Sequence, residues 1–191
     1  MRLDLRVYKK ELRNEMRSIR NTMNLALRKE KDRLIFQRLI RLTQYQKAQT
    51  IITYVSTDAE VDTRRLIEKA WEDGKKIAVP RCQKENHTME MFYINSMDDL
   101  EVGAYGILEP KIYTQKCSDW SGTLCIVPAF CNDKKGYRLG YGGGYYDRFL
   151  SVYSGITLGI NYSECVKNEI CKGRYDVPIK MLLTEKDKFR F

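Results

Sequence analysis

The segment between residues 50 and 80 constrains the fold more than any other part of this 191-residue chain. Its β-rich run Thr50-Ile-Ile-Thr-Tyr-Val55 predicts a strand, and Asp62 or Thr63 then caps a helix that continues to a stop at Gly74. Lys76-Ile-Ala-Val-Pro80 predicts the next strand. A strand, a helix and a second strand in this order are typical of a parallel crossover unit, which requires helices packed on a sheet.

The remaining apolar runs extend the same architecture. Met89–Ile94 predicts a strand that forms a hairpin with Lys76–Pro80, and Thr123–Val127 predicts a buried central strand. Residues 145–153 predict a helix, and two further strands are expected at Ile156–Ile160 and Met181–Leu183. No repeat or Pro/Gly-rich linker marks a boundary. We therefore expect one α/β domain over residues 1–191, a layered fold whose mixed, mostly parallel central sheet is flanked by helices.

A basic pair of helices precedes this unit. Over Val7–Asn21 the apolar residues fall on one helical face, and the cations Lys9, Arg13, Arg17 and Arg20 form an adjoining stripe. The apolar face comprises Leu12, Met16, Ile19 and Met23. A second helix is predicted from Leu25 to Leu42, capped by Asn24, with Leu34, Ile35, Leu39 and Leu42 as its buried side. Taken alone, the basic stripe is most simply a solvated face.

Charge and cysteine content narrow the function classes. With 34 Lys+Arg against 25 Asp+Glu, the net charge of +9 predicts attraction to an anion: a nucleotide, a polyanionic metabolite, nucleic acid or anionic lipid. No apolar run approaches the ~20 residues of a membrane helix, and the charged start MRLDLRVYKK is unlike a signal peptide. Six cysteines without a Cys-x-x-Cys pair indicate reduced thiols in the cytoplasm. The single histidine, His87, lies in the expected hairpin loop Gln83–Thr88, which argues against a zinc site or a Ser-His-Asp triad.

The segment Asp133–Arg148 carries the chemistry, because it holds five of the 12 glycines and leads from a buried strand into a helix. Glycines bring backbone amides close to a ligand, and a helix N-terminus adds partial positive charge, so the segment suits phosphate oxygens. It matches neither a Walker loop nor a dinucleotide fingerprint. Arg138 can clamp a phosphate, Tyr145 and Tyr146 offer aromatic faces, and Asp147 can hold magnesium. A merely flexible turn is the alternative.

At these residues a family resemblance becomes visible. The run Gly136-Tyr-Arg-Leu-Gly-Tyr-Gly-Gly-Gly-Tyr-Tyr-Asp-Arg148 closely resembles the signature of 5-formyltetrahydrofolate cyclo-ligases. The similarity follows the family's order over nearly the whole chain, and departs from it where Tyr105 replaces a frequent Trp and Lys180-Met181 replaces a common acidic pair. The other matching segments are Lys9–Arg13, Val55–Glu60, Val79–Arg81, Tyr105–Pro110 and Ile126–Pro128.

The resemblance implies an ATP-dependent ligase that closes 5-formyltetrahydrofolate to 5,10-methenyltetrahydrofolate with Mg²⁺, through phosphorylation of the formyl oxygen and release of ADP and phosphate. It implies ATP contacts from Lys9, Lys10, Arg13, Arg138, Leu139, Gly140, Tyr141, Gly142, Gly143, Gly144, Tyr145 and Tyr146. It implies folate contacts from Val55, Glu60, Arg81, Tyr105 and Tyr146. The metal would be held by Asp147, with Asp176 as a second candidate. Arg17 and Arg20 are expected to remain surface charges, and the protein is expected to be a monomer that binds neither nucleic acid nor membrane.

Two other interpretations stay open. A basic nucleic-acid-binding protein would use the N-terminal helices and the Tyr/Gly loop as a stacking platform, although no RNA- or DNA-binding motif is present. A relative of the sugar-phosphate isomerases would share the α/β layers, but fold analogy alone cannot assign a function.

Overall fold

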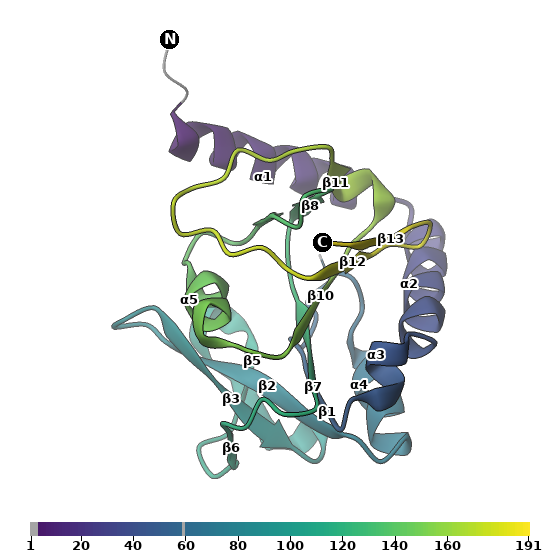
Figure 1. Cartoon of the computed structure of the whole chain (residues 1–191), viewed down its shortest axis with the longest axis vertical. Helices are drawn as coiled ribbons and strands as arrows, with labels where there is room; N and C mark the ends of the chain where they lie inside the picture. Colours follow the sequence, from purple (N-terminus) through teal and green to yellow (C-terminus); the bar gives the residue numbers. More distant parts are fainter. Residues whose placement is uncertain (1–3, 59) are drawn as a thin grey trace.

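The computed structural model, which describes residues 4–58 and 60–191, is organised around an eight-stranded sheet (Figure 1). From β12 to β2 all neighbouring strands run parallel, whereas β13, β3 and β6 pair antiparallel at the two edges. The expected mixed, mostly parallel sheet is confirmed. Its order is β13 (Lys188–Arg190), β12 (Met181–Leu183), β10 (Ile156–Ile160), β7 (Thr123–Val127), β1 (Thr50–Ile52), β2 (Lys76–Gln83), β3 (Thr88–Ile94) and β6 (Lys116–Cys117).

The predicted strands form where expected, with small differences in length. Ile51 of β1 lies between Ile77 of β2 and Leu124 of β7, so the crossover unit is parallel as the sequence indicated. Strand β1 ends at Ile52, before the expected Val55, although the Thr53 amide still donates to the Ala78 carbonyl at 2.9 Å. The β2–β3 hairpin turns through residues 84–87, as predicted.

Among the described residues, five helices pack around the sheet: α1 (Leu5–Thr22), α2 (Leu25–Ile40), α3 (Thr43–Lys47), α4 (Arg64–Glu72) and α5 (Tyr145–Val152). Asp4 caps α1 by accepting from the Arg6 amide at 2.8 Å, and Asn24 caps α2. At the start of α4 the carboxylate of Asp62 accepts from the Arg64 amide at 2.9 Å. Helix α4 stops before Gly74, whose φ of 71° suits a glycine.

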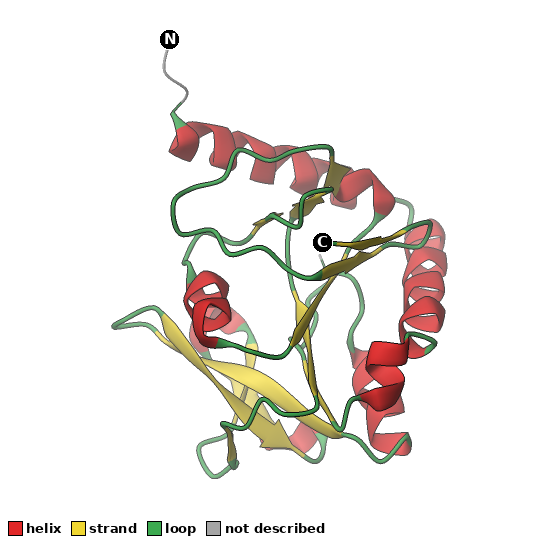
Figure 2. Ribbon diagram, viewed as in Figure 1, coloured by secondary structure: helices red, strands yellow, loops and turns green. Residues whose placement is uncertain are grey.

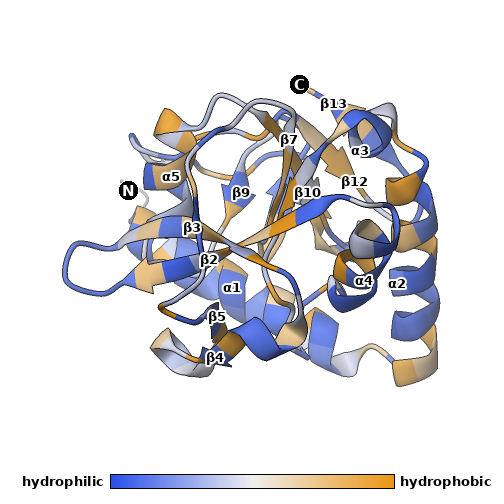
Figure 3. Ribbon diagram, turned by 90° about the horizontal axis from the view of Figure 1, so that it is seen from below, coloured by the Kyte–Doolittle hydropathy of each residue, from blue (hydrophilic) through white to orange (hydrophobic). Residues whose placement is uncertain are grey.

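Alternating strand residues face two separate apolar cores. Ile51, Ile77 and Leu124 point to the core shared with α1, α2 and α4, whereas Ile52 and Ala78 point to the core under α5. The hydropathy view shows apolar strands inside and a hydrophilic turn between β2 and β3 (Figure 3). The layered α/β expectation is therefore confirmed, with helices on both faces of the sheet.

The described residues also form two smaller sheets besides the eight-stranded sheet, and neither was predicted. Strands β4 (Leu100–Val102) and β5 (Leu108–Pro110) form an antiparallel pair around a 3₁₀ turn at Ala104–Gly106. The other sheet comprises β8 (Cys131–Asp133), β9 (Arg138–Leu139) and β11 (Val166–Lys167). After β11, a long loop passes beside α1 before it enters β12 (Figure 2). Across residues 4–58 and 60–191, none of the helices combines the length and apolar character that a membrane crossing requires.

Candidate functional site

The site lies at the sheet edge where the parallel strands end, and α1 crosses this edge. The guanidinium of Arg20 on α1 donates to the carbonyls of Ala129 at 2.6 Å and Phe130 at 3.0 Å, and to the side-chain oxygen of Asn161 at 2.9 Å. The expectation that Arg20 is a surface charge is therefore wrong, because only 2% of this residue is exposed. Open α/β sheets bind ligands at this edge, and Arg20 anchors α1 there.

The glycine-rich segment takes the backbone shape that its glycines permit. It turns back at Gly136, forms β9, and then crosses Gly142 at φ 107° and Gly144 at φ 72° before α5 begins. Such φ values are costly for residues with a Cβ. Because Gly144 occupies the N-cap position without a side chain, the first amides of α5 remain available to an anion.

Helix α1 brings the predicted cation Arg13 to this loop and the predicted cation Lys9 to the loop that follows β11. The Nε of Arg13 donates to the Gly140 carbonyl at 2.8 Å, although 127 residues separate them. A Cβ placed on Gly142 would lie 3.5 Å from the Arg13 guanidinium. One turn earlier, Lys9 forms an ion pair with Asp176 in the loop that follows β11. Burial lowers the pKa of Arg13, and the nearby Asp176 carboxylate partly opposes that shift.

Arg138 and Asp147 form a second ion pair beneath the loop. Arg138 is almost fully buried, and it donates to an Asp147 oxygen at 2.9 Å and to the Val177 carbonyl at 2.5 Å. The same Asp147 oxygen, Oδ1, accepts from the Val177 amide at 3.1 Å. Asp147 is thus bonded to the residue that follows Asp176, so both predicted metal ligands border the loop that follows β11.

Glu60 also contacts the glycine-rich loop. Its segment follows β1, and its Oε2 accepts from the Thr57 amide at 3.0 Å and the Thr57 hydroxyl at 3.1 Å. Its Oε1 accepts a hydrogen bond from the hydroxyl of Tyr141, which stands between Gly140 and Gly142. The residue predicted for folate is therefore in contact with the loop predicted for ATP.

A cluster of aromatic residues surrounds Tyr145, the first residue of α5. Tyr105, held at φ 59° in the β4–β5 turn, places its hydroxyl 3.1 Å from that of Tyr145. The ring of His87 meets Tyr145 edge-on at 5.5 Å, and His87 is an exposed loop residue as predicted. Arg81 pairs with Glu101 at 3.4 Å and donates to the Pro110 carbonyl, so it ties β2 to the small β4–β5 sheet.

Tyr141, Tyr145 and Tyr146 have raised pKa values and are neutral at neutral pH. Burial and the Glu60 carboxylate raise the pKa of Tyr141, and burial raises that of Tyr146 well above 10. The hydrogen bond with Tyr105 raises the pKa of Tyr145 to about 12. These hydroxyls can position a ligand, but they are poor general bases near pH 7.

Four predicted residues make none of these contacts, and one of them, Tyr146, packs against the core under α5. Val55 and Leu139 are buried in the core shared with α1 and α2, and Lys10 is exposed on α1. The prediction also missed the buried carboxylates of Glu109 and Asp133, which organise the backbone near the site. Glu109 accepts from the Cys82 amide at 3.1 Å, and Asp133 accepts from the amides of residues 135, 137 and 170. A signal was available for Asp133, since it lies shortly after the carboxyl end of the buried strand β7. Ligand sites of open α/β sheets lie at the carboxyl ends of the strands.

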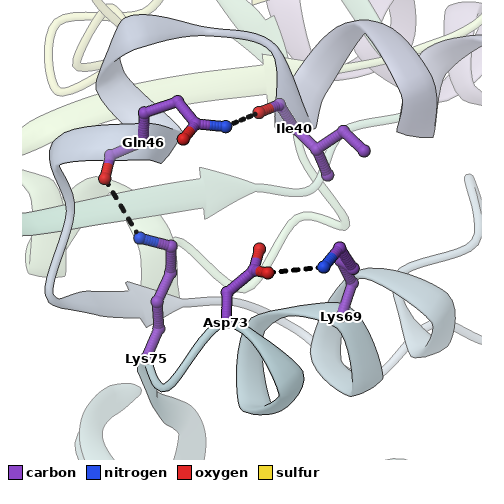
Figure 4. Close-up of a pocket in the computed structure, with 5 residues that line it drawn as sticks. All are labelled: Ile40, Gln46, Lys69, Asp73 and Lys75. Atoms are coloured by element: carbon purple, nitrogen blue, oxygen red, sulfur yellow. Dashed lines mark hydrogen bonds and ion pairs between the residues drawn. The ribbon is translucent and has the colours of Figure 1, made fainter.

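A separate surface depression lies between the α2–α3 connection and the end of α4 (Figure 4). Gln46 donates to the Ile40 carbonyl at 2.5 Å, Lys75 donates to the Gln46 carbonyl at 3.2 Å, and Lys69 pairs with Asp73. These bonds join neighbouring chain segments. The predicted site residues lie elsewhere, on the glycine-rich loop and the segments that contact it.

Comparison with known proteins identifies the family. The sequence profile of the 5-formyltetrahydrofolate cyclo-ligase family matches residues 6–185. The 5-formyltetrahydrofolate cyclo-ligase of Haemophilus influenzae is 27% identical over 177 residues, which cover 90% of this chain and 94% of that protein. The NMR structure of Aquifex aeolicus 5,10-methenyltetrahydrofolate synthetase, 28% identical, superposes with a TM-score of 0.85 over 95% of this chain and 92% of its own.

A second solved structure supports the fold. The 5,10-methenyltetrahydrofolate synthetase from Mycoplasma pneumoniae is 20% identical and superposes with a TM-score of 0.75 over 93% of this chain and 98% of its own. The glycine-rich run, the mostly parallel sheet and the family match over residues 6–185 agree with one another. The chain therefore belongs to the 5-formyltetrahydrofolate cyclo-ligase family, a family of ligases.

Proposed function

We propose that this chain catalyses the ATP-dependent cyclisation of 5-formyltetrahydrofolate to 5,10-methenyltetrahydrofolate, with release of ADP and phosphate. The observation that carries the proposal is the position of the glycine-rich loop. Arg13 donates a hydrogen bond to the loop at the Gly140 carbonyl, and the next residue of the loop, Tyr141, donates one to Glu60. A group suited to phosphate and a group suited to the pterin therefore border one short segment.

The chemistry accounts for the residue types. A formamide oxygen is a poor leaving group, so the terminal phosphoryl of ATP is transferred to it: an O–P bond forms as the bond to the ADP oxygen breaks. The neighbouring folate nitrogen then attacks the activated carbon, loses its proton and expels the oxygen as phosphate. Such a reaction depends on positioning and charge neutralisation more than on a protein nucleophile.

The chain's own side chains supply that positioning. Arg13 and the amides of Gly142–Gly144 would hold the phosphate oxygens, and the Arg138–Asp147 pair would support the loop from below. The Glu60 carboxylate would accept paired hydrogen bonds from the amino-pyrimidine edge of the pterin. Tyr105 and Tyr146 would wall the substrate, and Arg81 would stay near its tail or a phosphate.

Magnesium fits this site as an ion carried by the nucleotide. In residues 4–58 and 60–191, no three His, Cys, Asp or Glu side chains are grouped closely enough to hold a metal by themselves. Mg²⁺ bound with a nucleotide needs only one or two carboxylates besides the phosphates. Asp147 meets that need best. Its contacts with the Val177 amide and with the Arg138 guanidinium both use Oδ1, and its side chain is 29% exposed. When bound, the ion would neutralise phosphate charge.

We also propose a monomeric enzyme in the cytoplasm. All six cysteines are free thiols, as a reducing compartment would keep them. Burial raises the pKa of Cys82 and Cys131 to about 12, which keeps these two thiols protonated and unreactive.

The proposal is tested by mixing the protein with 5-formyltetrahydrofolate, ATP and Mg²⁺ and following the near-ultraviolet absorbance of the conjugated methenyl product. Product is expected only when nucleotide and divalent metal are both present, and full-rate turnover after chelation would remove the metal from the proposal. Folded protein that gives no product, but binds single-stranded RNA at physiological salt, would favour the nucleic-acid alternative.

A further inference from the structure

The turn between β4 and β5 holds Tyr105 in an unusual backbone conformation. Tyr105 lies at φ 59°, and the next residue, Gly106, lies at φ 72°. Glycine takes positive φ readily, whereas a residue with a side chain seldom does. Such a residue keeps this conformation only where its surroundings impose it, most often at a functional site. The contacts that hold the turn therefore bear on the function of Tyr105.

The turn presents Tyr105 to the site instead of burying it in the core. Tyr105 is 64% exposed, and its hydroxyl lies 3.1 Å from that of Tyr145, the first residue of α5. The two rings meet edge-on at 6.3 Å, and the ammonium group of Lys84 lies 5.4 Å from the centroid of the Tyr105 ring. An exposed ring in this place can bury its face against a ligand.

The buried carboxylate of Glu109 packs against the start of this turn. Glu109 is 6% exposed, and Gly103 is the residue before the 3₁₀ turn. A Cβ placed on Gly103 would lie 2.3 Å from Glu109 Oε2 and 2.6 Å from Glu109 Cδ, so the Glu109 side chain occupies the space of a side chain at position 103. The Gly103 amide donates to the Ile107 carbonyl at 2.8 Å, which closes the turn around Tyr105.

Glu109 also joins the turn to the central sheet. Its Oε1 accepts from the amide of Cys82 in β2 at 3.1 Å, and the neighbouring Arg81 donates to the Pro110 carbonyl at 3.1 Å. The hydrogen bond with Tyr105 is the main cause of the raised pKa of Tyr145, and the charge of Glu109 adds to it. One buried side chain thus contacts both β2 and the start of the turn, and it lies close to the partner of Tyr105.

We propose that Glu109 is a positioning residue: it fills the space against Gly103, bonds to β2, and thereby fixes the β4–β5 turn so that the Tyr105 ring faces the folate. This inference rests on the proposed function. Position 109 then needs an acceptor for the Cys82 amide and a side chain of the length of Glu. A wall contact is made equally in the ground state and the transition state, so its loss should raise KM for the folate and leave kcat nearly unchanged.

The test measures initial rates of methenyl product formation at varied 5-formyltetrahydrofolate, with saturating ATP and Mg²⁺. Tyr105→Ala and Glu109→Ala should each raise KM for the folate about fivefold, the ratio that corresponds to an aromatic contact of about 1 kcal/mol, whereas kcat and KM for ATP should stay near the wild-type values. The double variant should have the KM of either single variant, because Glu109 acts through Tyr105. Independent effects would instead multiply to about 25-fold.

Two further variants test the requirements at positions 109 and 103. Glu109→Gln keeps the length and an acceptor for the Cys82 amide, so its KM should stay close to that of the wild type. Gly103→Ala adds a methyl group that displaces the Glu109 carboxylate, so it should raise KM as Glu109→Ala does. It also serves as the test if Glu109→Ala does not fold.

Asp99→Ala is the matched control. Its carboxylate also accepts from backbone amides, those of Asn95 at 2.7 Å and Ser96 at 3.3 Å, but it lies at the opposite end of β4 from Gly103. Its loss should lower the free energy of urea unfolding and leave KM for the folate unchanged. The same rise in KM for Asp99→Ala would overturn the inference, because loosening any part of the small sheet would then suffice.

The other outcomes are equally decisive. Folded Glu109→Ala and Gly103→Ala proteins with the wild-type KM overturn the inference, as does a Tyr105→Ala protein with the wild-type KM. A double variant whose KM is the product of the two single effects, or a Glu109→Gln protein that behaves like Glu109→Ala, also overturns it. If the wild type forms no methenyl product, the proposed function and the inference fall together. If the wild type turns over and the Glu109 effects are absent, the inference alone fails.

Discussion

Arg13→Ala is the substitution that tests most directly whether α1 completes the proposed nucleotide site. Arg13 is half-buried and bonded to the Gly140 carbonyl at 2.8 Å, and a hydrogen bond from a charged donor contributes about 1.5–3 kcal/mol. If the same guanidinium stabilises phosphate charge in the transition state, its loss costs roughly 2–4 kcal/mol. We therefore expect kcat/KM for ATP to fall about 30- to 1000-fold.

Arg17→Ala is the internal control, since Arg17 lies one turn further along α1 but is exposed and donates to Asn14 at 3.1 Å. Its loss should change the free energy of unfolding by no more than about 0.5 kcal/mol and leave turnover unchanged. Arg13→Lys keeps the charge without the forked donors, so its activity should lie between the wild type and Arg13→Ala. The assay is initial-rate formation of the methenyl product at varied ATP, with urea unfolding in parallel. Equal, small effects of Arg13→Ala and Arg17→Ala on kcat/KM would refute the reasoning.

Four further substitutions test the site and the fold that supports it. Gly142→Ala, at φ 107°, should lower the free energy of urea unfolding by about 1–3 kcal/mol and weaken ATP binding, whereas Gly140→Ala, which meets open space, should not. Arg20→Met leaves buried carbonyls without a donor and should cost about 2–5 kcal/mol, whereas a loss below about 0.5 kcal/mol would mean that Arg20 behaves as a surface charge. Burial alone would raise the pKa of Glu185, but hydrogen bonds from Lys31 and Ser163 lower it overall, so its stabilisation is complete above pH about 4.5 and lost below. The stability difference between wild type and Glu185→Gln should therefore shrink as urea unfolding is repeated at decreasing pH, and a constant difference would contradict the linkage.

The strands were predictable because their signal is local. Ile51, Ile77 and Leu124 sit in short apolar runs, and such runs are buried wherever the chain places them. The burial of Arg20 was not predictable, because it depends on carbonyls 109 and 110 residues later and on Asn161. Strands of two or three residues, such as β8 and β9, are too short to show periodicity.

The candidate site was predicted as a set of residues, but not as a set of contacts. The Gly/Tyr motif indicated the phosphate loop from residue type alone, and the matching segments added Glu60 and Arg13. The hydrogen bond from Tyr141 to Glu60 and the burial of Arg138 against Asp147 follow from how distant segments pack. Sequence spacing carries no information on such contacts, because loop conformation and neighbouring backbone decide them.

The long sequence separation between α1 and its partners bears on how the protein is made. Lys9 pairs with Asp176, 167 residues later, and Arg20 meets Asn161, 141 residues later. During synthesis α1 is made before these partners, so its apolar face with Leu12 and Met16 has no sheet edge to cover until the strands that form this edge have left the ribosome. Contacts of such high sequence separation form late and slow folding. The proposed nucleotide site, which joins α1 to segments far along the sequence, would therefore be among the last parts of the molecule to form.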